Sequence, residues 1–207
     1  PAWSVMAKKL FPDFAPYISM AMTPMVLTAR LLKKEHKNCK VVFIGPCAAK
    51  KLEASRRTIR SDVDFVLTFE EALGIFAAKG MDKAFLPEDE EELPAYSSRD
   101  ARRFAYSGGV AQAVVNAIHD MQPEREVKVA AAAGLADCRK LLMMAKAGKY
   151  DGYLLEGMAC PGGCVAGAGT MQSIKKSSVA VNMYAKQAEH QVATGTHHVA
   201  ELDKLVD

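Results

Sequence analysis

The sequence predicts an α/β fold in which two lobes of mostly parallel β-sheet are flanked by helices. Short apolar runs alternate with helical patterns on both sides of residues 80–105, and that interval is rich in acids, prolines and serines. Alternation of this kind is typical of βαβ units, whose strands pair in parallel. Half of the 207 residues are hydrophobic, which is enough for a substantial core. We therefore expect residues 1–207 to form one domain or two closely packed lobes, with a lobe boundary near 80–105.

The first lobe is predicted from local start and stop signals. Thr23 is a suitable N-cap, and Pro24 suits the first helical turn, where a proline loses no hydrogen bond. Residues 41–44 are β-branched or aromatic and too few for a helix, so they indicate a buried strand. Thr68, followed by two glutamates, marks another helix start. The predicted elements are helices at Ser4–Phe11, Thr23–Glu35, Ala48–Ser55 and from Thr68, and strands at Cys39–Ile44 and Asp62–Leu67.

The second lobe repeats the alternation after the polar interval. We expect the pattern to stay irregular up to about Arg103 and then to resume at a glycine turn. Residues 173–207 are predicted to form a C-terminal helical segment that is broken near Ala193-Thr194-Gly195. The predicted elements are a helix from the Ser107-Gly108-Gly109 turn to about Met121, a strand at Val127–Ala132, a helix at Ala136–Ala147 and a strand at Tyr153–Glu156.

Charge and hydropathy exclude several classes of partner. Lysine and arginine number 27 against 24 acids, and the signs are interspersed, so the net charge of +3 predicts neither nucleic-acid binding nor attraction to an anionic membrane. No apolar run approaches the roughly 18–20 residues of a transmembrane helix, so we expect a soluble protein with no membrane span. Pro1-Ala2-Trp3 leads into a helical pattern without an initiator methionine, and we therefore expect residues before Pro1.

Five cysteines, an odd number, do not suggest a disulfide framework in a chain of this size. Cys47 follows the first predicted strand, and Cys160 and Cys164 follow the last, in turns rich in glycine and proline. Because sites in open α/β sheets form at the carboxyl ends of strands, we expect these three thiols to converge. Cys39 and Cys138 lack such surroundings, and we interpret them as small buried hydrophobic residues.

Converging thiolates would suit a metal centre. They are ligands for iron in iron–sulfur clusters and for zinc. Glycines beside the cysteines let backbone amides approach cluster sulfurs, which favours a cluster. A structural zinc site would want a fourth ligand and the paired Cys-x-x-Cys pattern that is absent here. The residues therefore favour an iron–sulfur centre over zinc, in a reducing compartment.

Two segments resemble signatures of the iron-only hydrogenases. Gly45-Pro46-Cys47-Ala48-Ala49-Lys50-Lys51-Leu52-Glu53 is similar to their second signature, Pro-Cys-x-x-Lys-x-x-Glu. Residues 156–169 resemble the third, Glu-x-Met-Ala-Cys-x-Gly-Gly-Cys followed by glycines, and Pro1-Ala2-Trp3 resembles the end of the first. The likeness extends to about Gln172 and implies the iron-only hydrogenase fold, with a cluster site between the two lobes.

The resemblance also implies a set of cluster contacts. Cys47, Cys160 and Cys164 would bind a 4Fe–4S cluster, and Cys164 would also bridge to a two-iron subcluster with carbonyl and cyanide ligands, the two together forming the H-cluster. Lys50 would hydrogen-bond a cyanide, a role that suits a fixed ammonium beside an anionic ligand. Met158 would pack against the iron unit as a polarizable apolar wall.

A proton path is the role that the resemblance implies for Glu53 and Ser19, because protons reach a buried metal through groups at hydrogen-bond intervals. The alternative for Lys50 and Glu53, which their spacing alone leaves open, is a plain i, i+3 surface ion pair. Ser107-Gly108-Gly109-Val110 also resembles a family segment, but a serine–glycine turn before a helix can be only a cap. We assign it no catalytic role.

The function that the resemblance implies is reversible reduction of protons to dihydrogen, an anaerobic oxidoreductase activity. Ferredoxin or upstream iron–sulfur domains would supply electrons, and H-cluster maturation proteins would be further partners. A cytoplasmic location is expected, or a periplasmic one if the parent protein carries an export signal. The fourth cluster thiolate of the family pattern lies before Pro1, so we expect residues 1–207 alone to hold no complete cluster and to be inactive.

Departures from the family pattern keep other interpretations open. Gly45 stands where a methionine is common, and Thr170-Met171 where a glutamine and a proline are usual. These changes fit a slow or sensory relative, or a non-catalytic iron–sulfur protein such as a cluster-assembly factor. The lysine, glutamate and methionine of the two signatures argue for the enzyme, because a plain cluster carrier has no cyanide ligand to serve. A zinc-stabilised interaction module is a third, unrelated alternative.

Overall fold

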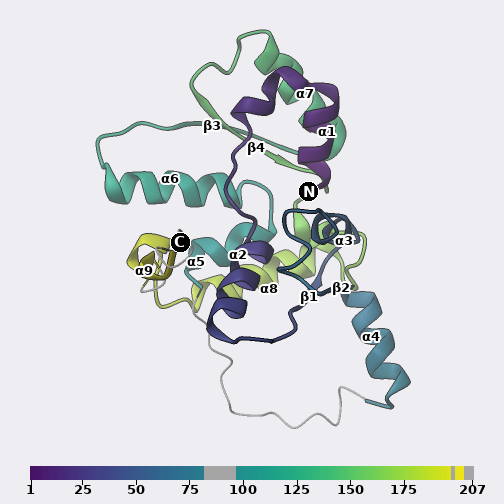
Figure 1. Cartoon of the computed structure of the whole chain (residues 1–207). Coiled ribbons are helices and arrows are strands. Elements are labelled where there is room, and N and C mark those ends of the chain that lie inside the picture. Colours follow the sequence, from purple (N-terminus) through teal and green to yellow (C-terminus); the bar gives the residue numbers. More distant parts are fainter. Residues whose placement is uncertain (82–96, 197–198, 203–207) are drawn as a thin grey trace. The chain divides into compact units, whose positions relative to one another are not determined.

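The computed structural model describes residues 1–81, 97–196 and 199–202, and it confirms the α/β class. Within these residues, two parallel two-stranded sheets are each accompanied by helices (Figure 1). Contacts divide the chain into a first unit, Pro1 with Ser19–Ala95 and Gly167–Met171, and a second unit, Ala2–Ile18 with Tyr96–Ala166 and Gln172–Asp207. The predicted lobe boundary near 80–105 includes residues 82–96, which lie outside the described residues.

The first unit is built around a parallel strand pair. Its elements are α2 Pro24–Glu35, β1 Val42–Gly45, α3 Ala49–Ala54, β2 Phe65–Thr68 and α4 Phe69–Ala78. The pairing runs from Val42 opposite Phe65 to Gly45 opposite Thr68, with α3 between the strands in the chain. The carboxyl ends of β1 and β2 therefore meet at one edge of the sheet. The core beside the sheet consists of Met25, Val26, Ala29 and Val63, against which Val41, Phe43, Ala54, Ile59 and Val66 pack.

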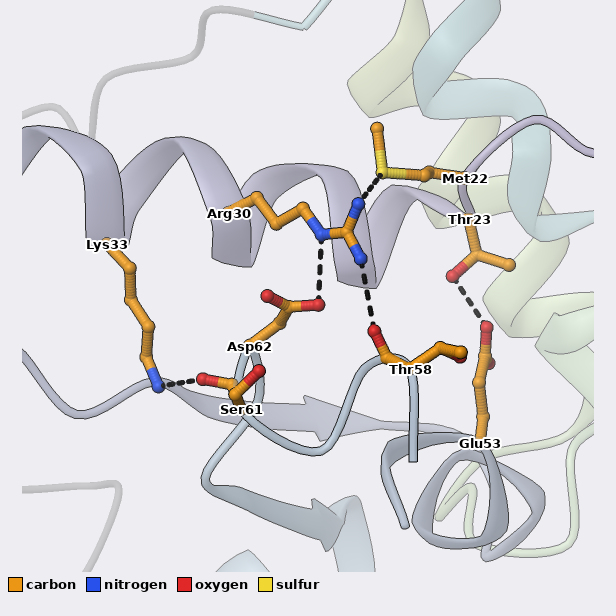
Figure 2. Close-up of polar contacts among 8 residues, drawn as sticks. All are labelled: Met22, Thr23, Arg30, Lys33, Glu53, Thr58, Ser61 and Asp62. Carbon is orange, nitrogen blue, oxygen red and sulfur yellow. Dashed lines mark hydrogen bonds and ion pairs between the residues drawn. The ribbon is translucent and has the colours of Figure 1, made fainter. Parts of the chain in front are cut away.

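Polar contacts fasten α2 to the segment between α3 and β2 (Figure 2). The Arg30 guanidinium binds the Asp62 carboxylate at 3.0 Å and donates to the Thr58 carbonyl at 3.3 Å. One turn further along α2, Lys33 donates to the Ser61 carbonyl at 2.7 Å. The segment between α3 and β2 is thereby held against α2 through two of its backbone carbonyls and the Asp62 carboxylate.

Asp64 joins α2 to the beginning of β1. Its carboxylate binds Lys33 at 2.7 Å, accepts from the Val41 amide at 2.9 Å and binds Lys40 at 3.2 Å. The Lys33 hydrogen bond, followed by that of the Val41 amide, holds the pKa of Asp64 below its usual range. These contacts explain why β2 begins at Phe65 and not at Asp62 as predicted, since the side chains before it are committed to α2 and to β1.

The second unit contains the other parallel pair. Its elements are α1 Ala2–Leu10, α5 Arg99–Arg102, α6 Gly109–Met121, β3 Lys128–Ala133, α7 Leu135–Lys146, β4 Tyr153–Met158, α8 Ile174–Lys186 and α9 Val199–Leu202. The register runs from Lys128 opposite Tyr153 to Ala133 opposite Met158. A core of Ala7, Phe11 and Leu142 joins α1 to α7. In the described ranges, no helix combines the length and apolar character that crossing a bilayer requires.

Helix starts agree well with the predictions. Thr23 is the N-cap residue of α2, and Pro24 lies in its first turn. At α4 the Thr68 hydroxyl accepts from the Glu71 amide at 3.1 Å, while the Glu71 carboxylate accepts from the Thr68 amide at 2.8 Å. This reciprocal capping box confirms the predicted start of α4.

Other predictions of secondary structure need correction. Strand β1 begins at Val42 and not at Cys39. The side chains of Val42 and Ile44 are exposed, so the prediction of a buried strand was wrong for the face that they share. Alternate residues of a strand face opposite sides, and Phe43 faces the core while its neighbours face away. Helix α5 lies in the interval predicted to be irregular, where Ser98 accepts from the Ala101 amide as N-cap. Helix α8 ends at Lys186, and only a short 3-10 helix occupies Ala193–Gly195.

The contacts of Arg30 give a test of how α2 is held. Arg30→Met keeps the apolar stem but removes the bonds to Asp62 and Thr58, and we expect it to lower the free energy of unfolding by about 1–2 kcal/mol. Arg57, an exposed arginine between α3 and β2, supplies the matched control Arg57→Met, which should change stability by less than about 0.5 kcal/mol. Urea unfolding followed by circular dichroism measures both. Equal losses in the two variants would contradict the role given to Arg30.

Candidate functional site

The turn after β1 carries the first of the predicted thiols. Strand β1 ends at Gly45, and Pro46 and the half-buried Cys47 lead into α3. A Cβ at residue 45 would overlap the ring of Phe43, two residues earlier on the same face of the strand. Gly45, one of the departures from the family pattern, is therefore the residue that leaves room for the Phe43 ring.

Glycines from the third signature pack directly on this turn. The Gly169 amide donates to the Pro46 carbonyl at 2.8 Å. A Cβ at residue 167 would overlap that carbonyl oxygen, and one at residue 169 would lie 2.7 Å from the Cβ of Thr68. Thr170, another departure from the pattern, closes the segment by donating from its hydroxyl to the Gly167 carbonyl at 2.7 Å. The end of the third signature and the proline of the second thus meet within the first unit.

Helix α3 places Lys50 and Glu53 on one face, where they form a buried ion pair. Lys50 Nζ lies 2.7 Å from Glu53 Oε2. The Thr23 hydroxyl donates to Glu53 Oε1 at 2.7 Å (Figure 2). Glu53 is only 3% exposed and the Lys50 side chain 16%. The i, i+3 pair exists and is largely buried, so the alternative of a plain surface pair does not hold.

Thr23 is a site residue that the sequence analysis did not identify. It was recognised only as an N-cap, yet its hydroxyl makes no capping bond and is committed to Glu53. Burial alone would raise the pKa of Glu53, but the hydrogen bonds from Lys50 and Thr23 outweigh it, so this pKa lies below its usual range. Glu53 is therefore a fixed anion that holds the Lys50 ammonium in place.

Ser19 lies outside this arrangement. Its side chain is exposed, and its oxygen accepts from the Ala21 amide at 3.2 Å. The side-chain partners recorded for Glu53 within the described residues are Thr23 and Lys50. A proton path through Glu53 and Ser19 stays a prediction.

The second unit carries the other two predicted thiols. Strand β4 ends at Met158, whose side chain is half-buried, and the half-buried Cys160 follows two residues later. Cys164 is exposed and begins the short 3-10 helix Cys164–Ala166. Cys138 on α7 is fully buried, as predicted, with its thiol pointing to the carbonyls of Ala132 and Met158.

Burial raises the pKa of the Cys138 thiol, which suits a packing role. Cys39 is only half-buried, so the prediction of a buried residue holds for Cys138 and not for Cys39.

Glu156 on β4 is a second residue that the sequence analysis quoted without a role. It is 7% exposed, and its carboxylate accepts from the amides of Gly108 and Ala111. The signal that could have found it is a lone acid inside an apolar strand, because a buried carboxylate needs dedicated hydrogen-bond donors.

The chemistry of this donor set fits an iron–sulfur group. All five cysteines lie in the described part of the chain, and none of them forms a disulfide. Cys47 belongs to the first unit and Cys160 and Cys164 to the second. In residues 1–81, 97–196 and 199–202, no group of three or more His, Cys, Asp or Glu side chains is arranged to hold a metal ion. Convergence of the three thiols stays a prediction, with soft sulfur ligands and adjacent glycines as its chemical support.

Comparisons with known proteins agree with the signatures. A profile of the family described as iron only hydrogenase large subunit, C-terminal domain, matches residues 1–168. The periplasmic Fe hydrogenase large subunit of Nitratidesulfovibrio vulgaris is 29% identical over 208 residues, which cover 82% of this chain and 49% of that protein. The cytosolic Fe-S cluster assembly factor NAR1 of Kluyveromyces lactis is 28% identical over 135 residues, which cover 61% of this chain and 29% of that protein. The chain spans half or less of the length of these relatives.

A solved structure extends the agreement to the fold. A variant of the FeFe-hydrogenase HydA1 from Chlamydomonas reinhardtii superposes with a TM-score of 0.75 at 22% sequence identity. The match covers 100% of this chain and 70% of that one. At this identity the likeness shows the shared fold alone.

The ionised state of Glu53 predicts a defined pH dependence of stability. Because its pKa in the folded chain is lowered, its stabilising effect is complete above the unfolded value of about 4.3 and is lost as the pH falls through the folded value. We expect Glu53→Gln to lower the free energy of unfolding at pH 7 by about 1.5–3 kcal/mol. The difference in free energy of unfolding between the unchanged chain and Glu53→Gln should become smaller as the pH is lowered.

Urea unfolding at a series of pH values measures this difference in free energy of unfolding. Glu35→Gln, at the exposed end of α2, is the matched control and should leave the stability unchanged at every pH. If the difference in free energy of unfolding between the unchanged chain and Glu53→Gln stayed constant below pH 4, the assignment of Glu53 as an anion in the folded chain would be contradicted.

Proposed function

The chain belongs to the family of iron-only hydrogenase large subunits, C-terminal domain, and from this premise we propose that it supplies cysteine ligands to the H-cluster of a hydrogenase. In this proposal Cys47, Cys160 and Cys164 bind the 4Fe–4S cluster, and Cys164 also binds the two-iron subcluster. The parent protein reversibly reduces protons to dihydrogen. Family membership supports an oxidoreductase, and the specific reaction is the proposal.

The observation that carries the proposal is the packing of the third signature on the second. Gly167 lies against the Pro46 carbonyl, next to Cys47 in the chain. Only Val165 and Ala166 separate Gly167 from Cys164, so the length of the peptide alone keeps the Cα atoms of residues 164 and 167 within about 11 Å. Chain connectivity thus supports a common ligand for Cys47 and Cys164.

When bound, the two-iron subcluster supplies the redox chemistry, and the residues of this chain set its surroundings. An ammonium has three N–H donors, and the bond to Glu53 uses one of those of Lys50. The others suit an anionic ligand such as cyanide, with Glu53 and Thr23 fixing the direction in which they point. Met158 offers a polarizable apolar surface beside Cys160 and limits the access of water.

We give Glu53 a positioning role in this proposal. A general acid or base works best when its pKa lies near the operating pH. The hydrogen bonds from Lys50 and Thr23 lower the pKa of Glu53 and so move it further from neutral pH. Its carboxylate is therefore better suited to orient Lys50 than to carry protons.

A second candidate is a non-catalytic iron–sulfur protein, which the similarity to the assembly factor NAR1 favours. The departures at Gly45 and Thr170 are compatible with it, because both residues have packing roles that are independent of a two-iron unit. The Lys50–Glu53 pair favours the hydrogenase, because it fixes an ammonium that suits a cyanide ligand, which a plain cluster carrier lacks.

Partners and location follow from the leading candidate. We infer an electron donor of the ferredoxin type, or upstream iron–sulfur domains, together with H-cluster maturation proteins. A cytoplasmic location fits the reducing conditions that thiolate ligands need, and a periplasmic one applies if the parent protein is exported.

Cluster binding is tested by anaerobic incubation of the chain with ferrous iron and sulfide. We expect the unchanged chain to bind iron with iron–sulfur absorbance through the thiolates of Cys47, Cys160 and Cys164, as a cluster without its fourth thiolate ligand. Cys47→Ser, Cys160→Ser and Cys164→Ser should each reduce the bound iron to less than roughly half, because each removes a thiolate ligand. Cys39→Ser is the control and should retain the iron. Equal loss in the control, or no loss in any of the three variants, would overturn the ligand assignment.

The enzyme assignment is tested in the parent protein loaded with a synthetic two-iron precursor. We expect carbonyl and cyanide infrared bands and hydrogen evolution. Lys50→Met should shift the cyanide bands and slow hydrogen evolution by roughly tenfold or more, equivalent to about 1.4 kcal/mol. Lys51→Met removes a neighbouring lysine that is 42% exposed and should change neither readout. An intact, fully loaded but inert protein would favour the assembly-factor candidate.

A further inference from the structure

The segment of residues 156–164, which ends β4 and forms the loop that carries Cys160, is hydrogen-bonded near both ends to the backbone of residues 107–111. At its start, Glu156 Oε1 accepts from the Gly108 amide and Oε2 from the Ala111 amide, each at 2.6 Å. At its far end, the Ser107 amide donates to the Gly162 carbonyl at 3.0 Å. All of these residues belong to the second unit.

The first tie replaces a missing helix cap. Gly108 is the N-cap residue of α6, with a φ of 86°, and it has no side chain with which to cap the helix. The carboxylate from β4 satisfies two backbone amides at this end, where the helix dipole also favours a negative charge. A charge that is 7% exposed is costly unless both oxygens are satisfied, so Glu156 holds β4 and α6 in a narrow range of relative positions.

The second tie depends on close backbone contact. Gly163 has a φ of 99°, and a Cβ there would lie 2.6 Å from both the Ser107 nitrogen and the Tyr106 Cα. Within the loop, the Gly163 amide donates to the Cys160 carbonyl at 3.0 Å, and the Ala166 amide donates to the Gly163 carbonyl at 3.0 Å. The backbones on either side of both cysteines are thereby hydrogen-bonded or tightly packed.

We propose that Glu156 is a positioning residue, which together with the Ser107 amide clamps the backbone of residues 156–164 so that Cys160 and Cys164 are preorganised for metal. The Ser107-Gly108-Gly109 turn, to which no catalytic role was assigned, serves as the anchor of this clamp. The inference rests on the proposed function in that the two thiolates are taken to bind cluster iron. A preorganised loop loses less conformational freedom on binding a ligand, which strengthens the binding.

Glu156→Gln tests the clamp while keeping the shape of the side chain. The amide group can accept from only one of the two backbone donors, so one bond is lost. We expect hydrogen exchange at the Gly108 and Ala111 amides to accelerate by about tenfold or more. The rates at which iodoacetamide alkylates Cys160 and Cys164, relative to Cys39, should change by about threefold or more as the loop loosens.

Phe11→Leu is the control for a general loss of stability. Phe11 belongs to the core of Ala7, Phe11 and Leu142 that joins α1 to α7 in the same unit. The substitution should lower the melting temperature without changing the alkylation ratios of Cys160 and Cys164. If the alkylation ratios of Cys160 and Cys164 changed in both variants, the effect of Glu156 would be explained by general stability and its positioning role would be contradicted.

Two further outcomes separate this inference from the proposed function. Unchanged amide exchange, or unchanged alkylation ratios, in Glu156→Gln would overturn the clamp even if the unchanged chain binds iron. If the unchanged chain binds no iron while exchange and alkylation respond as expected, the clamp is supported and the cluster assignment fails. Both arms use the whole chain, and the alkylation arm requires no metal.

Discussion

Close backbone contact at glycines is the constraint on which both cysteine turns depend. Gly167 and Gly169 press against the Pro46 carbonyl and Thr68, and Gly163 presses against the Tyr106–Ser107 backbone. At each of these places a Cβ would overlap backbone atoms or a fixed side chain, which a packed interior cannot accommodate without a shift of the chain. These contacts shape the cysteine turns through the polypeptide itself.

Two buried carboxylates complete this arrangement in different ways. Glu53 is compensated mainly by the cation of Lys50, so removing either partner leaves an unpaired charge in a buried place. Glu156 is compensated by the backbone amides of Gly108 and Ala111 and therefore fixes the positions of β4 and α6 relative to each other. Glu53 fixes the position of the Lys50 ammonium on α3, whereas Glu156 connects β4, the strand before Cys160, to the start of α6.

A shared fold does not decide between a hydrogenase and an assembly factor, because relatives of both kinds match this chain. The distinction lies in the residues around the thiols. Gly45 and Thr170 are accounted for by local packing, and Lys50 with Glu53 and Thr23 forms the feature that a cluster carrier has least need of. The choice between the two candidates therefore depends on a half-buried ammonium held by Glu53, whose carboxylate also binds the Thr23 hydroxyl.

The sequence alone determined the α/β class, the helix starts at Pro24 and Phe69, and the family to which the two cysteine signatures belong. These features are local: a cap, a proline or a run of alternating residues acts within a few positions of itself, and a signature can be read without knowing what it touches. Weak local signals were missed, as at the four-residue helix α5, and β1 was taken as buried on both faces.

Only the tertiary structure decided which partner satisfies each buried polar group. Thr23 looked like a cap and instead holds Glu53, and Glu156 looked like part of a motif and instead caps α6. The residues of each pair lie far apart in the chain, so no local pattern links them. A buried donor or acceptor must be satisfied, but which distant group satisfies it is set by how the segments pack.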